Sequence, residues 1–352
     1  MDFQVGKDGK GGRFPLKTVM TEKSIYVLDG KGKISKKISL EDYSQVAMSD
    51  DGMTMATLKG REITISNLDE EVQSVVKIAD PQPVVLPQHV FFELSPDGEY
   101  VVVMSFFTHT IYFHNRKGKL LSEHHFEDLR GAEVKFSKDS RYVAIHVPNW
   151  GEGKTNGYLL FFDEKGKKQW RFDHKGCEAK FDISSDGDAI VLAAENKLHS
   201  LNKKGKIIYE KELVPGGISI ALSGDGKYVA VTRKADHRLS LLDNGNGKAL
   251  WSHNISGFDS INSPFTSVDV SDDGVRVAVA ISKDWTRRNK ESSLYLFDKS
   301  GNILWRETFE QYRILGALWQ NRNCMLIAGN KEAFFIDMRN KSRTLPKIRG
   351  KR

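Results

Sequence analysis

Cysteine is almost absent from this chain. Only Cys177 and Cys324 occur among 352 residues, and they fall in parts of the sequence that are not neighbours in the repeat pattern described below. That separation favours two buried free thiols over a disulfide. The compartment in which the protein works is therefore left open by its cysteines.

Long apolar runs are also missing. The longest is Ala189–Ala194, whereas a membrane-spanning helix needs about 20 apolar residues. No membrane-spanning helix is predicted. No signal peptide is visible after Met1, and this start fits either a cytoplasmic chain or one from which an export signal has been removed.

Net charge is low through most of the chain and concentrated at its ends. Residues 1–40 hold 9 basic and 4 acidic residues, and residues 342–352 hold 5 basic residues and no acid. The stretch 41–341 holds 39 basic and 42 acidic residues, so the overall charge of +7 belongs to the two termini. The hydrophobic share of 39% is enough for a core.

A motif of an apolar residue followed by Ser-x-Asp-Gly recurs about every 45 residues. Degenerate copies lie at 136–140, 319–323 and 5–9. A fixed period of this size indicates a repeat architecture and not a particular chemistry. The clear copies are Met48–Gly52, Leu94–Gly98, Ile183–Gly187, Leu222–Gly226 and Val270–Gly274.

One repeat is read most easily between residues 265 and 309. Alternating residues Phe265–Val270 predict a strand, and the turn that follows leads to an apolar strand over Val275–Ile281. Further strands are expected at Leu294–Phe297 and Asn302–Phe309, on either side of a second turn. Four antiparallel strands in about 45 residues, with no helical periodicity, are typical of a propeller blade.

The second turn of the repeat also recurs along the chain. Eight copies of each turn predict eight blades, and seven stay open because the first and last repeats are the poorest. Small residues five positions after the turn Asp fit crowding near an axis, as at Ala56, Val102, Ala144, Val191, Ala230 and Ala278. The copies of the second turn are Asp29–Gly32, Asn115–Gly118, Asp163–Gly166, Asn202–Gly205, Asp243–Gly247 and Asp298–Gly301, with weak ones at Asn67–Glu71 and Asp337–Lys341.

Two stretches resemble known propeller families. Leu94–Val103 resembles the repeats of the Tol translocation system and of surface-layer YVTN proteins, and Leu294–Trp305 resembles the PQQ-like repeat, as do Leu160–Trp170 and Leu241–Trp251. The resemblance implies an all-β fold, a single propeller of four-stranded antiparallel blades related to WD40-type repeats. It implies that Trp170, Trp251 and Trp305 wedge between blades. Tyr209 substitutes for this Trp, and Lys36, Ser74 and Ser122 depart from the pattern.

The predicted boundaries follow from the repeats. One propeller domain is expected over 1–345, followed by a basic tail at 346–352. The expected blades are 1–40, 41–80, 88–128, 129–174, 175–213, 214–255, 262–309 and 310–345.

Several chemistries were weighed against the residues. Quinoprotein dehydrogenases of the resembling family use adjacent cysteines, which this chain lacks. Gly153-Lys154-Thr155 lacks the earlier glycine of a phosphate-binding loop, since residue 148 is proline. His124 and His125 are expected on opposite faces of a strand, which disfavours a shared metal. We expect no catalytic residue, no cofactor and no metal.

The insertions are all expected on one face, the face opposite the short glycine turns. They are 79–88, 147–157, 256–265 and 282–292, and this loop face is predicted to bind a partner protein because rigid scaffolds present function on loops. The alternative is that the loops only pack over one another. The residues singled out there are Trp150, Trp285, Arg287, Arg288, Phe106, Phe107, His109, Arg233 and His237.

A second surface is suggested by the basic termini, which a closed propeller would bring together. Such a patch can hold an acidic partner, anionic lipid headgroups or nucleic acid, and the alternative is a solvated face with a disordered tail. The residues are Lys31, Lys33, Lys36, Lys37, Arg343, Lys347, Arg349, Lys351 and Arg352.

The function expected from the sequence is that of a non-enzymatic, monomeric protein-interaction scaffold. A small-ligand sensor or degenerate quinoprotein enzyme using the central channel is the alternative, and a nonspecific anion-binding module is a third hypothesis. Relatives by resemblance include the propeller subunit of the outer-membrane β-barrel assembly machinery. By analogy this implies a place outside the cytoplasm.

Overall fold

The fold was examined in a computed structural model. It describes residues 17–20, 24–28, 34–39, 43–67, 71–78, 89–149, 155–176, 178–214, 218–233, 238–255, 265–282, 291–310, 314–321, 324–329, 333–337 and 342–344. Side chains are described at 36–39, 43–67, 71–78, 89–149, 155–176, 178–214, 218–233, 238–255, 267–282 and 292–309. These ranges contain strands and turns and no α-helix, and so no helix that could span a bilayer.

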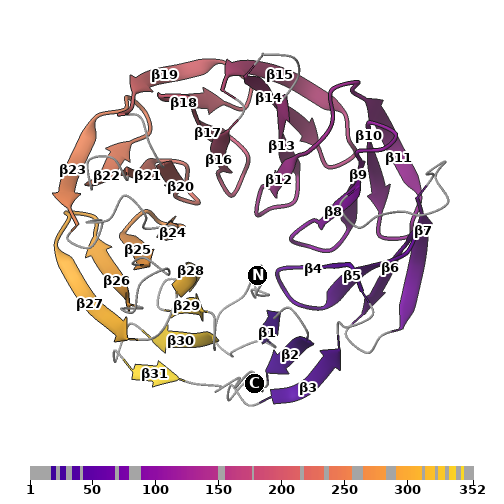
Figure 1. Ribbon diagram of the computed structural model, residues 1–352, viewed down its shortest axis with the longest axis horizontal. Helices are drawn as coiled ribbons and strands as arrows, with labels where there is room; N and C mark the ends of the chain where they lie inside the picture. Colours follow the sequence, from indigo (N-terminus) through magenta and orange to yellow (C-terminus); the bar gives the residue numbers. More distant parts are fainter. Residues whose placement is uncertain are drawn as a thin grey trace. The chain divides into compact units, whose positions relative to one another are not determined.

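The described strands form eight antiparallel sheets, which we call blades 1 to 8 (Figure 1). Blade 1 has three described strands and the others have four, always in chain order. Blades 1 to 4 are β1 (Lys17–Met20), β2 (Ser24–Leu28), β3 (Ile34–Ser39); β4 (Gln45–Met48), β5 (Thr54–Lys59), β6 (Glu62–Asn67), β7 (Val72–Lys77); β8 (Val90–Leu94), β9 (Tyr100–Ser105), β10 (Thr110–Asn115), β11 (Leu120–His125); and β12 (Glu133–Phe136), β13 (Tyr142–Asn149), β14 (Asn156–Asp163), β15 (Lys168–Lys175). The number of sheets among the described residues matches the eight blades predicted.

Blades 5 to 8 follow the same plan. They are β16 (Ala179–Ile183), β17 (Ala189–Ala194), β18 (Lys197–Asn202), β19 (Ile207–Glu212); β20 (Ile218–Leu222), β21 (Tyr228–Arg233), β22 (Arg238–Asp243), β23 (Ala249–Asn254); β24 (Phe265–Val270), β25 (Arg276–Ser282), β26 (Glu291–Asp298), β27 (Ile303–Glu310); and β28 (Ile314–Asn321), β29 (Cys324–Gly329), β30 (Ala333–Asp337), β31 (Ser342–Thr344). The strands predicted for blade 7 are all present, with ends shifted by up to three residues.

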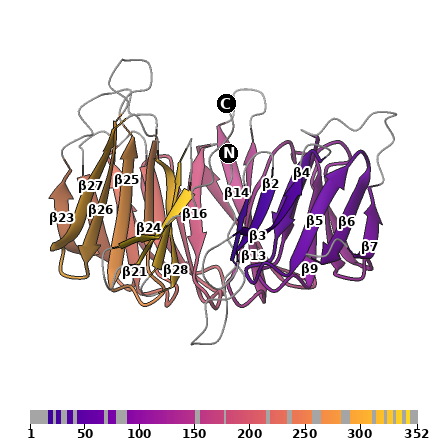
Figure 2. The same cartoon turned by 90° about the horizontal axis from the view of Figure 1, so that it is seen from below.

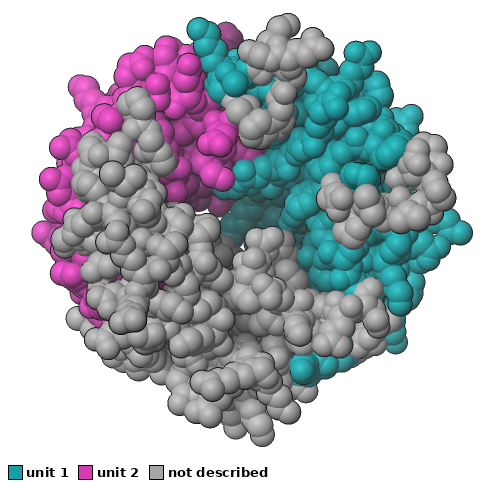
Figure 3. Space-filling view, in the orientation of Figure 1, with its two compact units in different colours: residues 1–177 teal, residues 178–352 magenta. Residues whose placement is uncertain are grey.

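The chain packs as two compact units, residues 1–177 and 178–352 (Figure 3). The division falls in the connection between blades 4 and 5. A single domain over 1–345 stays a prediction. Figure 2 shows β4 to β7 of the first unit standing side by side as neighbouring strands of one sheet.

Burial follows strand position within each blade. The second strands are almost fully buried, as in β21 and β25, because neighbouring blades cover both of their faces. The predicted small positions Ala144, Val191 and Ala230 are 0% exposed. The fourth strands instead alternate between exposed and half-buried residues, so we call them the outer strands.

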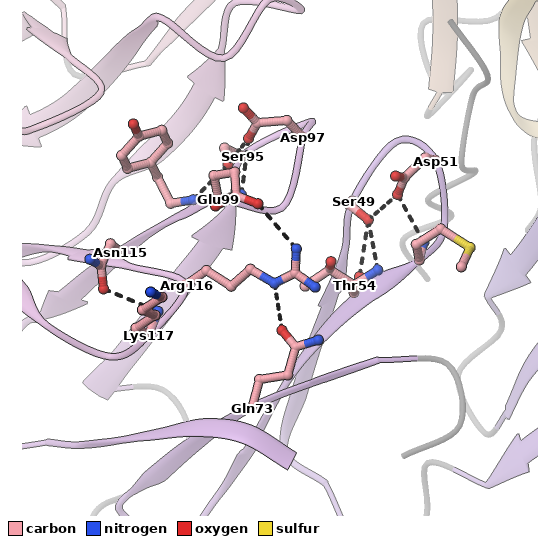
Figure 4. A network of polar contacts seen from close by, with 12 residues as sticks. Ser49, Asp51, Thr54, Gln73, Ser95, Asp97, Glu99, Asn115, Arg116 and Lys117 are labelled. Carbon is pink, nitrogen blue, oxygen red and sulfur yellow. Dashed lines mark hydrogen bonds and ion pairs between the residues drawn. The ribbon is translucent and has the colours of Figure 1, made fainter. Parts of the chain in front are cut away.

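The first turn of blades 2 to 7 is built by its serine and aspartate, as Figure 4 shows for blades 2 and 3. In blade 3 the Ser95 hydroxyl donates to Asp97 Oδ1 at 2.7 Å and accepts from the Tyr100 amide at 2.9 Å. Gly98 takes φ +73°, which a residue with a Cβ rarely adopts. The motif recurs because its residue types close this turn.

Blade 4 keeps the turn without the glycine. Ser140 stands in the glycine position at φ +62°, and its hydroxyl accepts a hydrogen bond from the Asp97 amide of blade 3 at 3.0 Å. The strained conformation is therefore compensated by a contact between blades. This explains why the copy at 136–140 is degenerate in sequence but intact in structure.

The second turn is closed by an Asn or Asp cap and packs against the preceding blade. In blade 3, Asn115 Oδ1 accepts from the amides of Lys117 and Lys119. Arg116 beside it donates to Gln73 on β7 and to Glu99 of its own blade (Figure 4). The Ser74 hydroxyl of β7 donates to the Arg116 carbonyl at 2.7 Å. Blades 2 and 3 are thus joined at this turn by hydrogen bonds.

One position of the outer strand makes this junction repeatedly. It pairs with the residue before a β-bulge in the third strand, and it is occupied by Lys36, Ser74, Ser122, Trp170, Tyr209, Trp251 and Trp305. The Trp251 indole donates to the Lys299 carbonyl of the next blade at 3.0 Å, and the Ser122 hydroxyl donates to the Lys165 carbonyl at 3.0 Å. Trp170 stacks on Phe161 of its own blade with ring centroids 4.9 Å apart. Lys36, Ser74 and Ser122 depart from the wedge pattern in sequence but occupy the same position in the fold. Ser74 and Ser122 also donate a hydrogen bond to a carbonyl of the next blade, as Trp251 does.

The predicted loop at 147–157 is wrong in its extent. Val147, Pro148 and Asn149 belong to β13 and pair with Tyr158, Gly157 and Asn156 of β14. Burial explains the difference, since Val147 is 0% and Tyr158 1% exposed. Proline is tolerated because the ladder from β12 ends at His146 and requires no amide from residue 148.

The half-buried His114 and the buried His199 predict a loss of stability in mild acid. Burial lowers the pKa of both His114 and His199. A hydrogen bond to the Gly118 carbonyl raises the pKa of His114, and the charge of Glu210 raises that of His199, but in each case burial has the larger effect. The unfolded chain then binds protons more readily, so this stability is present above the ordinary histidine pKa and is lost as the pH falls below it. We expect the unfolding temperature to drop by a few degrees between pH 7.5 and pH 5.5. The double variant His114→Gln, His199→Gln should show a flatter profile, and an equally steep profile would contradict this assignment.

Candidate functional site

Three of the predicted docking residues lie together in the hairpin between β9 and β10. They are Phe106, Phe107 and His109, on the side of blade 3 opposite its glycine turns. Arg233 ends β21 in the second unit. Trp150, Trp285, Arg287, Arg288 and His237 lie outside the described residues.

The predicted basic patch is described in small part. Lys36 and Lys37 lie on β3, and Arg343 belongs to β31, where only the backbone is described. Lys31, Lys33, Lys347, Arg349, Lys351 and Arg352 lie outside the described residues. The patch stays a prediction.

The hairpin at 106–109 is held by its own hydrogen bonds. The Phe106 amide donates to the His89 carbonyl at 2.9 Å, and the Thr108 amide donates to the buried Ser105 hydroxyl at 3.2 Å. His109 adopts φ +53°, a conformation for which histidine is enriched among residues with a Cβ. The side chains of this turn are therefore presented from a fixed backbone.

His109 connects the hairpin to the segment leading into blade 4. Its Nδ1 lies 2.8 Å from the Leu129 carbonyl, and because a carbonyl only accepts, Nδ1 carries the proton. The Phe126 amide in turn donates to the His109 carbonyl at 2.8 Å. His125 Nδ1 lies 3.1 Å from the Thr108 carbonyl, and the rings of His109 and His125 meet edge to face at 6.3 Å.

Aromatic side chains line the same edge of blade 3. Phe106 is half-buried and packs against the core cluster that includes Met104, Ile111 and Leu129. Phe107 is half-buried too, and its ring lies 5.8 Å from the ring of His89. We call His89, Phe106, Phe107, His109 and His125 the docking edge.

Sequence reasoning missed two members of this edge. His89 directly follows the insertion 79–88. Its place between this insertion and the first strand of blade 3 could have indicated that it lies on the loop face. His125 was considered in the sequence as a possible metal ligand beside His124. Its neighbour His124 contacts a different partner, the Gly166 carbonyl at 2.6 Å, which agrees with the expectation that the two histidines diverge.

A hydrogen bond between the buried Tyr158 and the half-buried Asp128 holds the connection that leads into blade 4. The Tyr158 hydroxyl donates to Asp128 Oδ1 at 2.6 Å, and the Arg171 guanidinium lies 3.7 Å from the centre of the Tyr158 ring. Burial, together with the Asp128 carboxylate, raises the pKa of Tyr158 well above its usual range. Tyr158 therefore stays protonated as the donor that anchors the 126–132 segment to blade 4.

The chemistry offered here is that of recognition. The docking edge supplies half-buried aromatic faces and imidazoles from a hydrogen-bonded turn. Among the residues the structure describes, no three His, Cys, Asp or Glu side chains lie close enough to share a metal ion.

Comparison with known proteins identifies a family. A family model described as outer membrane protein assembly factor BamB matches residues 155–344. Among curated proteins, no significant match to the sequence is found.

Solved structures agree on the fold. BamB from Moraxella catarrhalis superposes with a TM-score of 0.59 at 13% identity, covering 92% of each chain. Saccharomyces cerevisiae Sqt1 superposes with a TM-score of 0.61 at 12% identity, covering 86% of this chain and 84% of that one. The Dos1 propeller superposes with a TM-score of 0.60 at 11% identity, covering 92% of each chain.

These identities are low enough that the structural likeness speaks for the fold alone. The all-β prediction and the propeller of antiparallel blades are confirmed by it. The family model covers more than half of the sequence. The chain therefore belongs to the PQQ-like repeat family described as outer membrane protein assembly factor BamB, with a β-propeller fold.

Proposed function

We propose that this protein is a non-enzymatic scaffold that binds a partner protein through the docking edge of blade 3. The observation that carries the proposal is the pair of half-buried phenylalanines, Phe106 and Phe107, set among three histidines on a turn with little freedom. Aromatic side chains on a rigid backbone lose little entropy on binding, which is why they serve as interface anchors.

Two further observations support this function. The turn is tied to blade 4 through His109 and Leu129, so the surface is already organised before a partner arrives. Membership of a family described as an assembly factor supports a partner that is itself a protein. Trp150 and Trp285, which were predicted on the loop face, lie outside the described residues and are not part of the docking edge.

Substitution of the docking edge tests the proposal. The full chain is immobilised, and the proteins that it retains from an extract of its own cells are quantified for the wild type and for Phe107→Ala. We expect at least one retained protein to fall roughly thirtyfold with Phe107→Ala, as for a hot spot of about 2 kcal/mol.

The matched control is Lys59→Ala, an exposed residue at the end of β5 beside the corresponding hairpin of blade 2. It should leave retention unchanged, and thermal unfolding should show that both variants remain folded. Equal retention by Phe107→Ala and the wild type would contradict a docking role for this edge.

A further inference from the structure

Blades 5, 6 and 7 expose a row of large aliphatic side chains. Ile207 is 48% exposed and Ile208 42%, Leu250 is 45%, and Ile303 and Leu304 are 56% and 41%. All five lie at the start of an outer strand, directly after the second turn of their blade. The same place also exposes Val72 in blade 2 (61%) and Leu120 in blade 3 (44%), so exposure at one blade alone does not mark a surface. Three successive blades of one unit that share it indicate a surface with a use.

The three turns lie side by side within the second unit. Lys211 Nζ of blade 5 donates to the Gly247 carbonyl in the turn of blade 6 at 2.9 Å. Trp251 of blade 6 donates to the Lys299 carbonyl in the turn of blade 7 at 3.0 Å. The aliphatic residues therefore follow one another from blade to blade.

Lysines accompany the row. Residues 202–208, 243–250 and 298–304 contain five lysines and two aspartates. Both aspartates are occupied as turn caps, since Asp243 Oδ1 accepts from the Gly245 amide and Asp298 Oδ1 from the amides of Ser300 and Asn302. We call the row and its lysines the basic rim: Lys203, Lys204, Lys206, Ile207, Ile208, Lys248, Leu250, Lys299, Ile303 and Leu304.

The combination fits a lipid surface better than a nucleic acid. Aliphatic side chains insert between headgroups, and lysines attract anionic lipids. Single-stranded nucleic acid is held by stacking aromatics, and the exposed row contains none. Lysines on an outer strand can also serve only to prevent pairing with the sheet edge of another molecule. That role does not require exposed aliphatic side chains beside them.

Aspartates of the first turns lie close to the basic rim in the same blades. Lys203 Nζ of the rim pairs with Asp188 Oδ1 at 3.1 Å, and Lys227 pairs with Asp225 Oδ2 within its own turn at 3.1 Å. The charge that the rim offers to an anionic surface therefore comes mainly from its other lysines, Lys204, Lys206, Lys248 and Lys299.

We propose that the basic rim binds the surface of an anionic lipid bilayer. This surface is separate from the docking edge, and its test does not depend on the proposed partner protein. Binding is measured by sedimentation of the full chain with vesicles of phosphatidylcholine, alone or mixed with phosphatidylglycerol. The wild type should bind the mixed vesicles, and binding should fall as salt is raised.

The variant Ile207→Thr, Leu250→Thr, Ile303→Thr places β-branched residues, which favour strands, at all three positions and should lower partitioning to mixed vesicles at least roughly tenfold. Lys204→Glu, Lys206→Glu should do the same. The matched control is Val72→Thr, at the same position of blade 2, where Val72 is 61% exposed but follows Asp69, Glu70 and Glu71. It should bind as the wild type does.

Three results would overturn the proposal. The first is that the wild type does not bind mixed vesicles, and the second is that Val72→Thr loses as much binding as the triple threonine variant. The third is that a soluble polyanion displaces the protein completely from the vesicles while the triple threonine variant binds as the wild type does. The last would assign the rim to a charged polymer. Unfolding temperatures close to the wild type are expected for all variants, because the substituted side chains are exposed.

Discussion

Gly166→Ala should lower the free energy of unfolding by about 2 to 5 kcal/mol. Gly166 has φ +81°, and placing a Cβ at such an angle costs about 1 to 2 kcal/mol. The added methyl group would also lie 2.5 Å from the Phe113 ring and collide with the Ser122 hydroxyl of the preceding blade. Overpacking of this kind costs about 1 to 3 kcal/mol more. Denaturant-induced unfolding of the purified chain measures the sum.

Gly60→Ala separates the two contributions. Gly60 has φ +59°, but a Cβ there would meet nothing within 4 Å. This variant should lose only the conformational part, about 1 to 2 kcal/mol. Equal losses at the two glycines would show that the close approach of blade 3 to the turn of blade 4 does not contribute to stability.

Trp251→Ala should cost about 2 to 4 kcal/mol. Its indole donates to the Lys299 carbonyl and stacks against Phe297 with ring centroids 5.4 Å apart. Truncation of a buried Trp costs about 3 to 5 kcal/mol, and the value is reduced here because the side chain is half-buried. The same unfolding experiment measures the loss.

Trp251→Tyr and Leu250→Ala are the companions to this variant. Trp251→Tyr should lower the free energy of unfolding by only about 1 kcal/mol. The reason is that Tyr209 occupies the same position in blade 5 and lies against Gly247 in the turn of the next blade. Leu250→Ala removes an exposed neighbour and should change stability by less than about 0.5 kcal/mol. If Trp251→Ala lowered the free energy of unfolding as little as Leu250→Ala, the wedge position would not contribute to stability.

The architecture could be predicted because its determinants are local. Ser95 and Asp97 close their turn with each other and with amides at most five residues away, so the residue types are visible wherever the turn recurs. Strand ends in blade 7 were predicted to within three residues for the same reason. The small residues five positions after the turn Asp marked the second strands correctly.

The remaining features depend on contacts between distant residues. Ser140 replaces a turn glycine because its hydroxyl reaches the Asp97 amide in another blade. Ser74 and Ser122 occupy the wedge position with a side chain too small to be recognised as a wedge. His125 joins the docking edge only because its ring meets Thr108 and His109 across a hairpin. Such pairings over 15 or more residues leave no periodic trace.

Site-specific photocrosslinking tests the central claim most directly. A benzoylphenylalanine is placed at position 107 on the docking edge or at position 117, an exposed site in the second turn of the same blade, and cells that make the full chain are irradiated. Position 107 should give a discrete covalent adduct with a protein partner, and position 117 should not give that adduct. No adduct at position 107, or the same adducts at both positions, would contradict binding through the docking edge.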